Sequence, residues 1–144
     1  MNGRCGIPAQ RRGTAPVDLL QVTVAEARAG VLVVAPVGEV DVSTAGLLRC
    51  VTHEAVESGP RSVVVDLSGL TFCGSTGLVA LLAAREHADR RGVGFGTAGG
   101  RAGMLRVLEI SGFGPVLRHH ERLEDALAAV GNGVSAEGDL LGAP

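Results

Sequence analysis

The spacing of hydrophobic and polar positions changes several times along the chain, and it first predicts a pair of strands. Residues 19–24 alternate apolar and polar side chains, as a half-exposed strand does. Residues 31–37 are apolar almost throughout, which is typical of a central strand. The short Arg-Ala-Gly segment at 28–30 lies between them, so we expect the two strands to form a hairpin.

A helix and a buried strand are expected next. Apolar positions recur at helical spacing until the Ser-Gly-Pro segment at 58–60, which ends the pattern. Asp41, Ser43 and Thr44 offer side-chain oxygens that can cap the first turn of this helix. Residues 62–66 then form a run of valines bounded by polar residues, which predicts a buried strand.

The remaining pattern predicts a closing series of helices and short strands. They are a helix from Ser75 to about Gly92, a short strand at 93–95, a helix at 101–110, a short strand at 115–117 and a helix at 122–130. The whole order is ββαβαβαβα. It predicts an α/β fold with a mixed sheet of about 4–5 strands and about 4 helices packed on it.

Composition indicates a single domain with irregular ends. The chain has 144 residues, of which 46% are hydrophobic, and this is enough for one packed core. Residues 1–17 are rich in Gly, Pro and Arg without periodicity, and residues 132–144 are similar in character. We therefore expect disordered tails at 1–17 and 132–144 around one domain at 18–131.

Charge and cysteine content exclude several classes of function. The net charge is −2 and the only aromatic residues are three Phe, so the chain lacks the basic stripe and stacking platform that nucleic-acid binding requires. No apolar stretch resembles a secretory signal or a membrane span. The three cysteines are odd in number and lack a CxxC spacing, which argues against a disulfide framework or a zinc site. A cytoplasmic protein is expected, and the use of Arg without any Lys suggests a bacterial genome rich in G and C.

The most informative segment is the strand, turn and helix between residues 63 and 82. Almost no bulky side chain occurs in Cys73-Gly74-Ser75-Thr76-Gly77, and helical spacing begins directly afterwards. Ser75 or Thr76 is therefore the expected N-cap of this helix. A hydroxyl at that place would also hold an added phosphate favourably, because free N–H groups and the positive end of the helix dipole face it.

Three segments of the chain carry a resemblance: DLSGLTFCGSTGL at 66–78, GEVDVSTA at 38–45 and RVLEISGF at 106–113. They resemble segments of the STAS domains, and specifically of the bacterial anti-sigma factor antagonists. Residues 66–78 are similar to the phosphorylation-site segment of that family. Residues 38–45 resemble its early Gly-Glu-hydrophobic-Asp stretch, and residues 106–113 resemble its late helix-then-Gly element. The three segments follow the order of the family, and the resemblance covers about residues 19–130.

The resemblance implies a binding module that is switched by phosphorylation. It implies that Ser75 is the phosphoacceptor, with Thr76 as the second candidate. It also implies that the unphosphorylated chain sequesters an anti-sigma factor, often a serine kinase of the histidine-kinase-like ATPase type, and that a phosphatase resets the switch. The chain would then be no enzyme, need no cofactor or metal, and regulate sigma-factor-dependent transcription such as a stress response. The partner-binding residues that the resemblance implies are Glu39, Asp41, Thr44, Gly74, Ser75, Thr76, Gly77 and Leu78.

One residue departs from the family pattern. Gly74 stands where the family has Asp, so the carboxylate beside the acceptor is missing. If that carboxylate orients the hydroxyl or the kinase, Ser75 is phosphorylated slowly, by a different kinase, or not at all. However, Gly74 also removes a like charge next to any phosphate on Ser75, and this makes the phosphate easier to accommodate. The sequence leaves both readings open.

Other readings are weaker but remain as alternatives. A STAS module can act as an unphosphorylated scaffold in a sensory or transport complex. The segment 94–99 matches the dinucleotide pattern GxGxxG literally but lacks a full βαβ unit, so a flexible loop is expected there. A serine hydrolase would need a GxSxG elbow, and no histidine has a spacing that links it to Ser75. Glu39 and Asp41 share one face of a strand end but lack the further ligands of a metal site.

Overall fold

The computed structural model describes residues 19–132. The expected N-terminal tail (1–17) lies outside the described residues, as does the expected C-terminal tail (132–144) except for Asn132, which ends the last helix. Along the described chain the elements are β1 (Leu20–Arg28), β2 (Val31–Val40), α1 (Ala45–Glu57), β3 (Ser62–Asp66), β4 (Leu70–Cys73), α2 (Ser75–Arg91), β5 (Gly94–Ala98), α3 (Ala102–Ser111), α4 (Phe113–Val116), β6 (His119–His120) and α5 (Leu123–Asn132).

The strands form one mixed sheet, as the sequence predicts. β1 and β2 make the expected antiparallel hairpin, while β3 pairs in parallel with both β2 and β5. The strand order is β1-β2-β3-β5-β6, and β4 pairs with the far end of β2 beyond β3. Parallel neighbours require crossovers, and α1 and α2 supply them.

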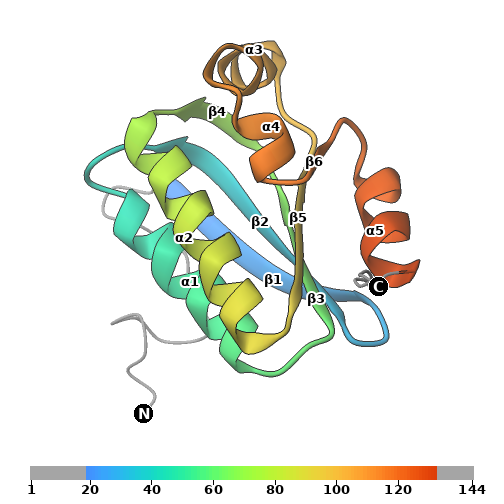
Figure 1. Cartoon of the computed structure of the whole chain (residues 1–144). Helices are drawn as coiled ribbons and strands as arrows, with labels where there is room; N and C mark the ends of the chain where they lie inside the picture. The colour runs from blue at the N-terminus through green and yellow to red at the C-terminus, as the bar shows by residue number, and fades with distance from the viewer. Residues whose placement is uncertain (1–18, 133–144) are drawn as a thin grey trace.

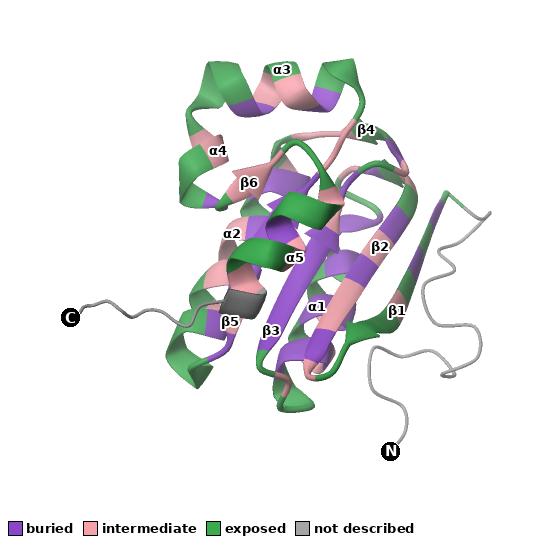
Figure 2. Cartoon of the chain, turned by 90° about the vertical axis from the view of Figure 1, so that its right-hand side faces the viewer, coloured by how far each residue is buried: buried purple, intermediate pink, exposed green. Residues whose placement is uncertain are grey.

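Helices cover both faces of the sheet, and the two faces have different cores. α1 and α2 lie side by side on one face (Figure 1), over the larger cluster, which includes Leu20, Val34, Val63 and Leu81. α5 covers the opposite face over β3 and β5, where Val64 belongs to a smaller cluster. Buried residues run along β3 from Ser62 to Val65 (Figure 2), as the valine run predicts for a central strand.

The structure corrects the sequence prediction in the second half of the chain. β4 was not expected, and residues 115–117 are not a strand, because α4 ends at Val116 and the last strand is β6 at His119–His120. The GxGxxG segment is not a flexible loop, because Gly94–Ala98 is the buried strand β5 between β3 and β6. A Cβ atom at Gly94 would lie 2.6 Å from Oγ of Ser62, so this glycine serves strand packing.

Candidate functional site

The predicted site lies where two parallel strands end side by side. β2 pairs with β4 so that Glu39 stands opposite Phe72. The backbone N–H of Gly74 donates to the carbonyl of Val40 at 2.9 Å, which joins the start of α2 to the end of β2. The loop that follows β2 and the first turn of α2 therefore lie at the same end of the sheet.

Gly74, rather than Ser75 or Thr76, is the N-cap of α2. Its backbone is extended (φ −83°, ψ −174°), and its carbonyl accepts the N–H of Gly77 at 3.0 Å. Ser75 and Thr76 are already helical, and no side chain caps the helix. The predicted cap is thus wrong by one residue. Gly is an acceptable N-cap, and in this family pattern the Asp that Gly74 replaces would occupy the capping position.

Ser75 presents its side chain to solvent at a helix end with unpaired donors. It is exposed, and its hydroxyl forms no hydrogen bond with any described residue. The first N–H groups of a helix have no intrahelical acceptor, and they carry the positive end of the dipole. The first turn of α2 contains no acidic side chain. An anionic group on Ser75 would therefore meet donors and no opposing carboxylate in that turn. Thr76 is half-buried and less accessible.

Two residues predicted to contact a partner, Gly77 and Leu78, are buried in the free chain. Leu78 is only 7% exposed and packs in the larger core cluster. Gly77 is also buried, and a Cβ atom there would collide with Sγ of Cys73 and lie 2.9 Å from Cγ1 of Val40. Glycine at this position lets α2 approach the ends of β2 and β4 closely. Both residues are covered in the free chain because the first turn of α2 packs against the sheet, and their contact with a partner stays a prediction.

The loop between β2 and α1 is held by its own polar side chains. Oδ1 of Asp41 accepts hydrogen bonds from the backbone N–H of Ser43 at 2.9 Å and from its hydroxyl at 2.7 Å. Oγ1 of Thr44 accepts from the N–H of Asp41 at 2.9 Å and donates to the carbonyl of Glu39 at 2.8 Å. The hydrogen bonds from Ser43, followed by those from Thr44, hold the pKa of Asp41 below its ordinary value of 3.8.

These bonds change the roles that the sequence assigned to the loop. Thr44 is the N-cap of α1 but makes no side-chain bond to the helix, and it is 1% exposed. It therefore fixes the loop from inside, and the expected side-chain capping of α1 is not observed. Glu39 is exposed and Asp41 is half-buried, so both remain accessible beside Ser75.

Apolar side chains are also exposed on or next to the elements that carry Ser75, Glu39 and Asp41. Val42 in the loop is 83% exposed, Phe72 on β4 is 54% exposed and Val79 on α2 is 54% exposed. Val79 follows Ser75 by four residues on the helix, so the two share one face. Val42 and Phe72 are not among the partner-binding residues that the resemblance implies, although two apolar residues flanked by turns were a detectable signal. We name the surface formed by Val42, Phe72, Ser75 and Val79 the Ser75 surface.

Two cysteines lie in the described part of the chain. Cys73 is free and half-buried next to the Ser75 surface, and burial raises the pKa of its thiol to about 11. The thiol is therefore protonated and weakly nucleophilic at neutral pH. Cys50 on α1 is disulfide-bonded, which the number and spacing of the cysteines did not predict.

The structure shows no catalytic arrangement around Ser75 among residues 19–132. His53 and His87 lie on α1 and α2, while His119 and His120 form β6, and none of them hydrogen-bonds to Ser75. A serine nucleophile needs such a base within hydrogen-bond reach. Within the same residues, no helix is both long and apolar enough to cross a membrane.

Comparisons with known proteins agree with the resemblance seen in the sequence. The model of the STAS domain family matches residues 23–126. The chain is 35% identical over 116 residues to the Anti-sigma-F factor antagonist RsfB of Mycobacterium tuberculosis (strain ATCC 25618 / H37Rv), which covers 81% of this chain and 93% of that protein.

Solved structures give the same assignment. The crystal structure of an anti-sigma factor antagonist from Mycobacterium paratuberculosis aligns with a TM-score of 0.72 and 32% identity, covering 81% of this chain and 97% of the other. The unphosphorylated anti-sigma factor antagonist SpoIIAA aligns with a TM-score of 0.63 over 79% of this chain and 99% of the other, and at 18% identity it supports the fold alone. The chain therefore belongs to the STAS domain family and groups with its anti-sigma factor antagonists.

Proposed function

We propose that this chain binds an anti-sigma factor through the Ser75 surface and releases it when Ser75 is phosphorylated. The observation that carries the proposal is the exposed hydroxyl of Ser75, which lies at a helix N-terminus without a side-chain cap, with Phe72 and Val79 also exposed. The names of the relatives RsfB and the Mycobacterium paratuberculosis protein support the partner class. Glu39 and Asp41 supply acidic groups at the rim of the same surface.

The physical basis of the switch is desolvation. In the free chain, a phosphate on Ser75 is held by water and by the N–H groups at the start of α2, so it does not disturb the fold. In a complex, the Ser75 surface is covered and the phosphate brings about −1.5 to −2 charges into the interface. Burying that charge costs more than it returns unless the partner offers a cation. This cost offsets the binding free energy that the apolar side chains of the Ser75 surface contribute, so the complex dissociates.

The chain itself would carry out no reaction in this scheme. A serine kinase of the histidine-kinase-like ATPase type would transfer the γ-phosphoryl group of ATP to Oγ of Ser75, and a phosphatase would remove it by hydrolysis. The half-buried position of Thr76 supports Ser75 as the acceptor of the two. The proposal assigns the chain to the cytoplasm, as a regulator of sigma-factor-dependent transcription without a cofactor of its own.

A pair of substitutions tests the proposal. The partner is first captured from the protein's own cells with the Ser75→Ala chain as bait, identified by mass spectrometry and purified. Isothermal titration then compares Ser75→Ala with Ser75→Glu. We expect Ser75→Glu to bind more than tenfold more weakly, which is about 1.4 kcal/mol. Thr76→Glu is not a matched control because Thr76 is half-buried, so Glu86→Gln, on the exposed surface later in α2, serves as the control.

The alternative function is a constitutive scaffold in a sensory or transport complex. The missing carboxylate at Gly74 favours this alternative, since it removes a group that the family carries beside the acceptor. A scaffold would bind its partner equally well as Ser75→Ala and as Ser75→Glu. Equal affinities would therefore reject the phosphorylation switch and retain the scaffold.

A further inference from the structure

A second group of chemically active side chains lies between α1 and α2, near the end of the helix pair that is remote from Ser75. His53 and Glu57 are on α1, and His87 is on α2. His87 follows Ser75 by twelve residues on one helix, which corresponds to roughly 18 Å. The group is thus separate from the Ser75 surface. We propose that His53, Glu57 and His87 bind a divalent transition metal ion such as Zn²⁺.

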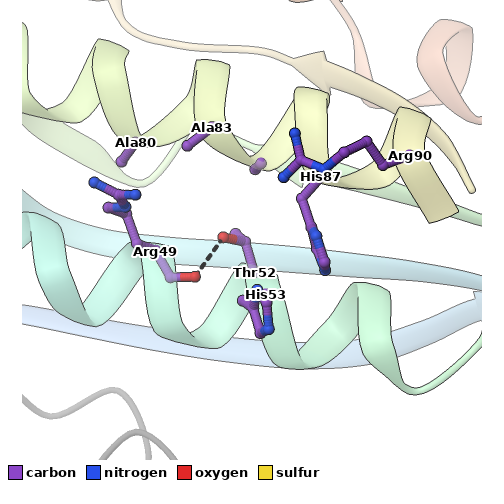
Figure 3. Close-up of a pocket in the computed structure, with 8 residues that line it drawn as sticks. Arg49, Thr52, His53, Ala80, Ala83, His87 and Arg90 are labelled. Carbon is purple, nitrogen blue, oxygen red and sulfur yellow. Dashed lines mark hydrogen bonds between the residues drawn. The ribbon is translucent and has the colours of Figure 1, made fainter.

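The three side chains already lie close together. His53 and Glu57 are four residues apart, so they share one face of α1. The rings of His53 and His87 stack with centroids 4.2 Å apart and planes inclined by 16°. One ligand atom from each of the three residues lies within 4.8 Å of the other two. Figure 3 shows His53 and His87 on the two helices, lining the same shallow pocket.

His87 and Glu57 make a close contact that is an ion pair only when the imidazole is protonated. Nε2 of His87 lies 2.7 Å from Oε2 of Glu57, yet the two atoms are not aligned for a hydrogen bond. Nε2 is inaccessible to solvent and has no hydrogen-bond partner, although 13% of the His87 side chain is exposed. A metal ion between the nitrogen and the oxygen would satisfy both atoms.

The donor set fits a borderline transition metal. Two imidazole nitrogens and one carboxylate are a ligand set found at zinc sites with an open fourth position. Ligand atoms around tetrahedral zinc lie about 3.3 Å apart, given bonds of about 2.0–2.2 Å. To reach that spacing, the 2.7 Å contact between His87 and Glu57 must open and the wider separations, up to 4.8 Å, must close. His53 and Glu57 are exposed, so their side chains have room to rotate. The fourth position would face solvent.

Nearby arginines set the electrostatics of the site. Nε of Arg91 lies 3.2 Å from Oε2 of Glu57, and its NH2 group donates to Oε1 at 3.2 Å. If the metal takes Oε2, Arg91 retains Oε1 and orients the carboxylate, as groups behind a metal ligand commonly do. Arg49 and Arg90 line the adjoining pocket (Figure 3), so an anion or hydroxide suits the fourth position. The positive charge of these arginines also lowers the affinity of the site for a cation, relative to a site with uncharged neighbours.

The test uses the full chain without an affinity tag, after treatment with a chelator. Isothermal titration with ZnCl₂ measures stoichiometry and affinity, and titration with Co²⁺ gives a visible spectrum that reports tetrahedral coordination. We expect one ion per chain and an increase in melting temperature on binding. His53→Gln and His87→Gln should each weaken Zn²⁺ binding at least about tenfold. His120→Gln is the matched control, because it removes a histidine on β6 and leaves the cluster intact.

Two results with the wild type and the histidine variants would overturn the site. One is the absence of stoichiometric Zn²⁺ binding, and the other is equal affinity in the wild type, His53→Gln and His87→Gln. If His87→Gln lowers the melting temperature of the metal-free chain, the Zn²⁺ affinity of His53→Gln alone decides whether the site exists. His53 is exposed, so its replacement should disturb the packing of the fold little. Cys73→Ser, tested in parallel, should retain Zn²⁺ binding, and loss of binding in that variant would assign the ion to the thiol instead.

Discussion

Leu78 and Val79 are neighbours at the start of α2, and their truncation to Ala should have different consequences. Leu78→Ala should lower stability, whereas Val79→Ala should weaken partner binding. Leu78 is 7% exposed and packs in the larger core cluster, so Leu78→Ala leaves a cavity. Leu-to-Ala changes in cores cost about 2–5 kcal/mol, and we expect about 3 kcal/mol here because the site is one turn from the helix end. That loss lowers the melting temperature by roughly 12 °C in a domain of this size.

Val79→Ala should scarcely change stability, because Val79 is 54% exposed. The packing it loses is offset by the higher helix propensity of Ala, so the change should stay within about 0.5 kcal/mol. Its effect should appear in partner binding. Covering the exposed half of a Val side chain contributes about 0.8 kcal/mol, so Kd should rise about fourfold.

Urea denaturation followed by circular dichroism measures the first effect, since the chain has no Trp or Tyr for fluorescence. The urea midpoint of Leu78→Ala should fall with an unchanged m-value, while that of Val79→Ala stays close to the wild type. Titration with the captured partner measures the second effect. The reasoning is refuted if Val79→Ala loses as much stability as Leu78→Ala, because the exposed face of α2 would then be assigned incorrectly.

Three further predictions concern groups around the Ser75 surface. Since burial raises the pKa of Cys73 to about 11, iodoacetamide at pH 8 should alkylate it much more slowly in the folded chain than in urea, and equal rates would contradict this. An NMR titration of Asp41 should give a pKa below 3.8, and this pKa should rise in Ser43→Ala. The hydrogen bonds to the Asp41 carboxylate therefore stabilise the fold above pH 3.8, and this stabilisation is lost as the pH falls through the lowered pKa of the folded chain. An unshifted pKa would contradict this. Gly74→Asp should raise the free energy of unfolding by about 0.5 kcal/mol, because Asp caps a helix better than Gly. The backbone accepts the change, since φ is −83° and the new Cβ would make an ordinary 3.4 Å contact with Phe72. A lower urea midpoint would contradict this prediction.

The sequence predicted those parts of the fold that local pattern determines. β1 alternates apolar and polar residues, β2 and β3 are continuous apolar runs, and apolar residues recur at helical spacing in α1, α2 and α3. β4 has no such pattern, because Thr71 and Phe72 are both exposed in a strand of four residues. α4 contains a Gly and a Pro, which favoured a turn or an edge strand over a helix.

The residues of the candidate site came from the family resemblance, and the structure shows how they are arranged. The resemblance located Ser75 and the loop of Glu39 and Asp41, and pairing of β2 with β4 brings them to one end of the sheet. Whether Leu78 or Val79 faces the core depends on how α2 rotates against the sheet, and two adjacent apolar residues leave that undetermined. The same holds for the contact of His87 with α1, since only helix packing brings it there.

The most direct test of the central claim is the intact mass of this protein taken from its own cells, before and after phosphatase treatment, with fragmentation to locate any phosphate. The account predicts a phosphatase-sensitive form about 80 Da heavier, which is the mass of one phosphoryl group, with the phosphate on Ser75. It also predicts that the fraction of this form changes between growth and stress. A protein that carries no phosphate on Ser75 under either condition would contradict the switch and leave Ser75 as an ordinary first residue of α2.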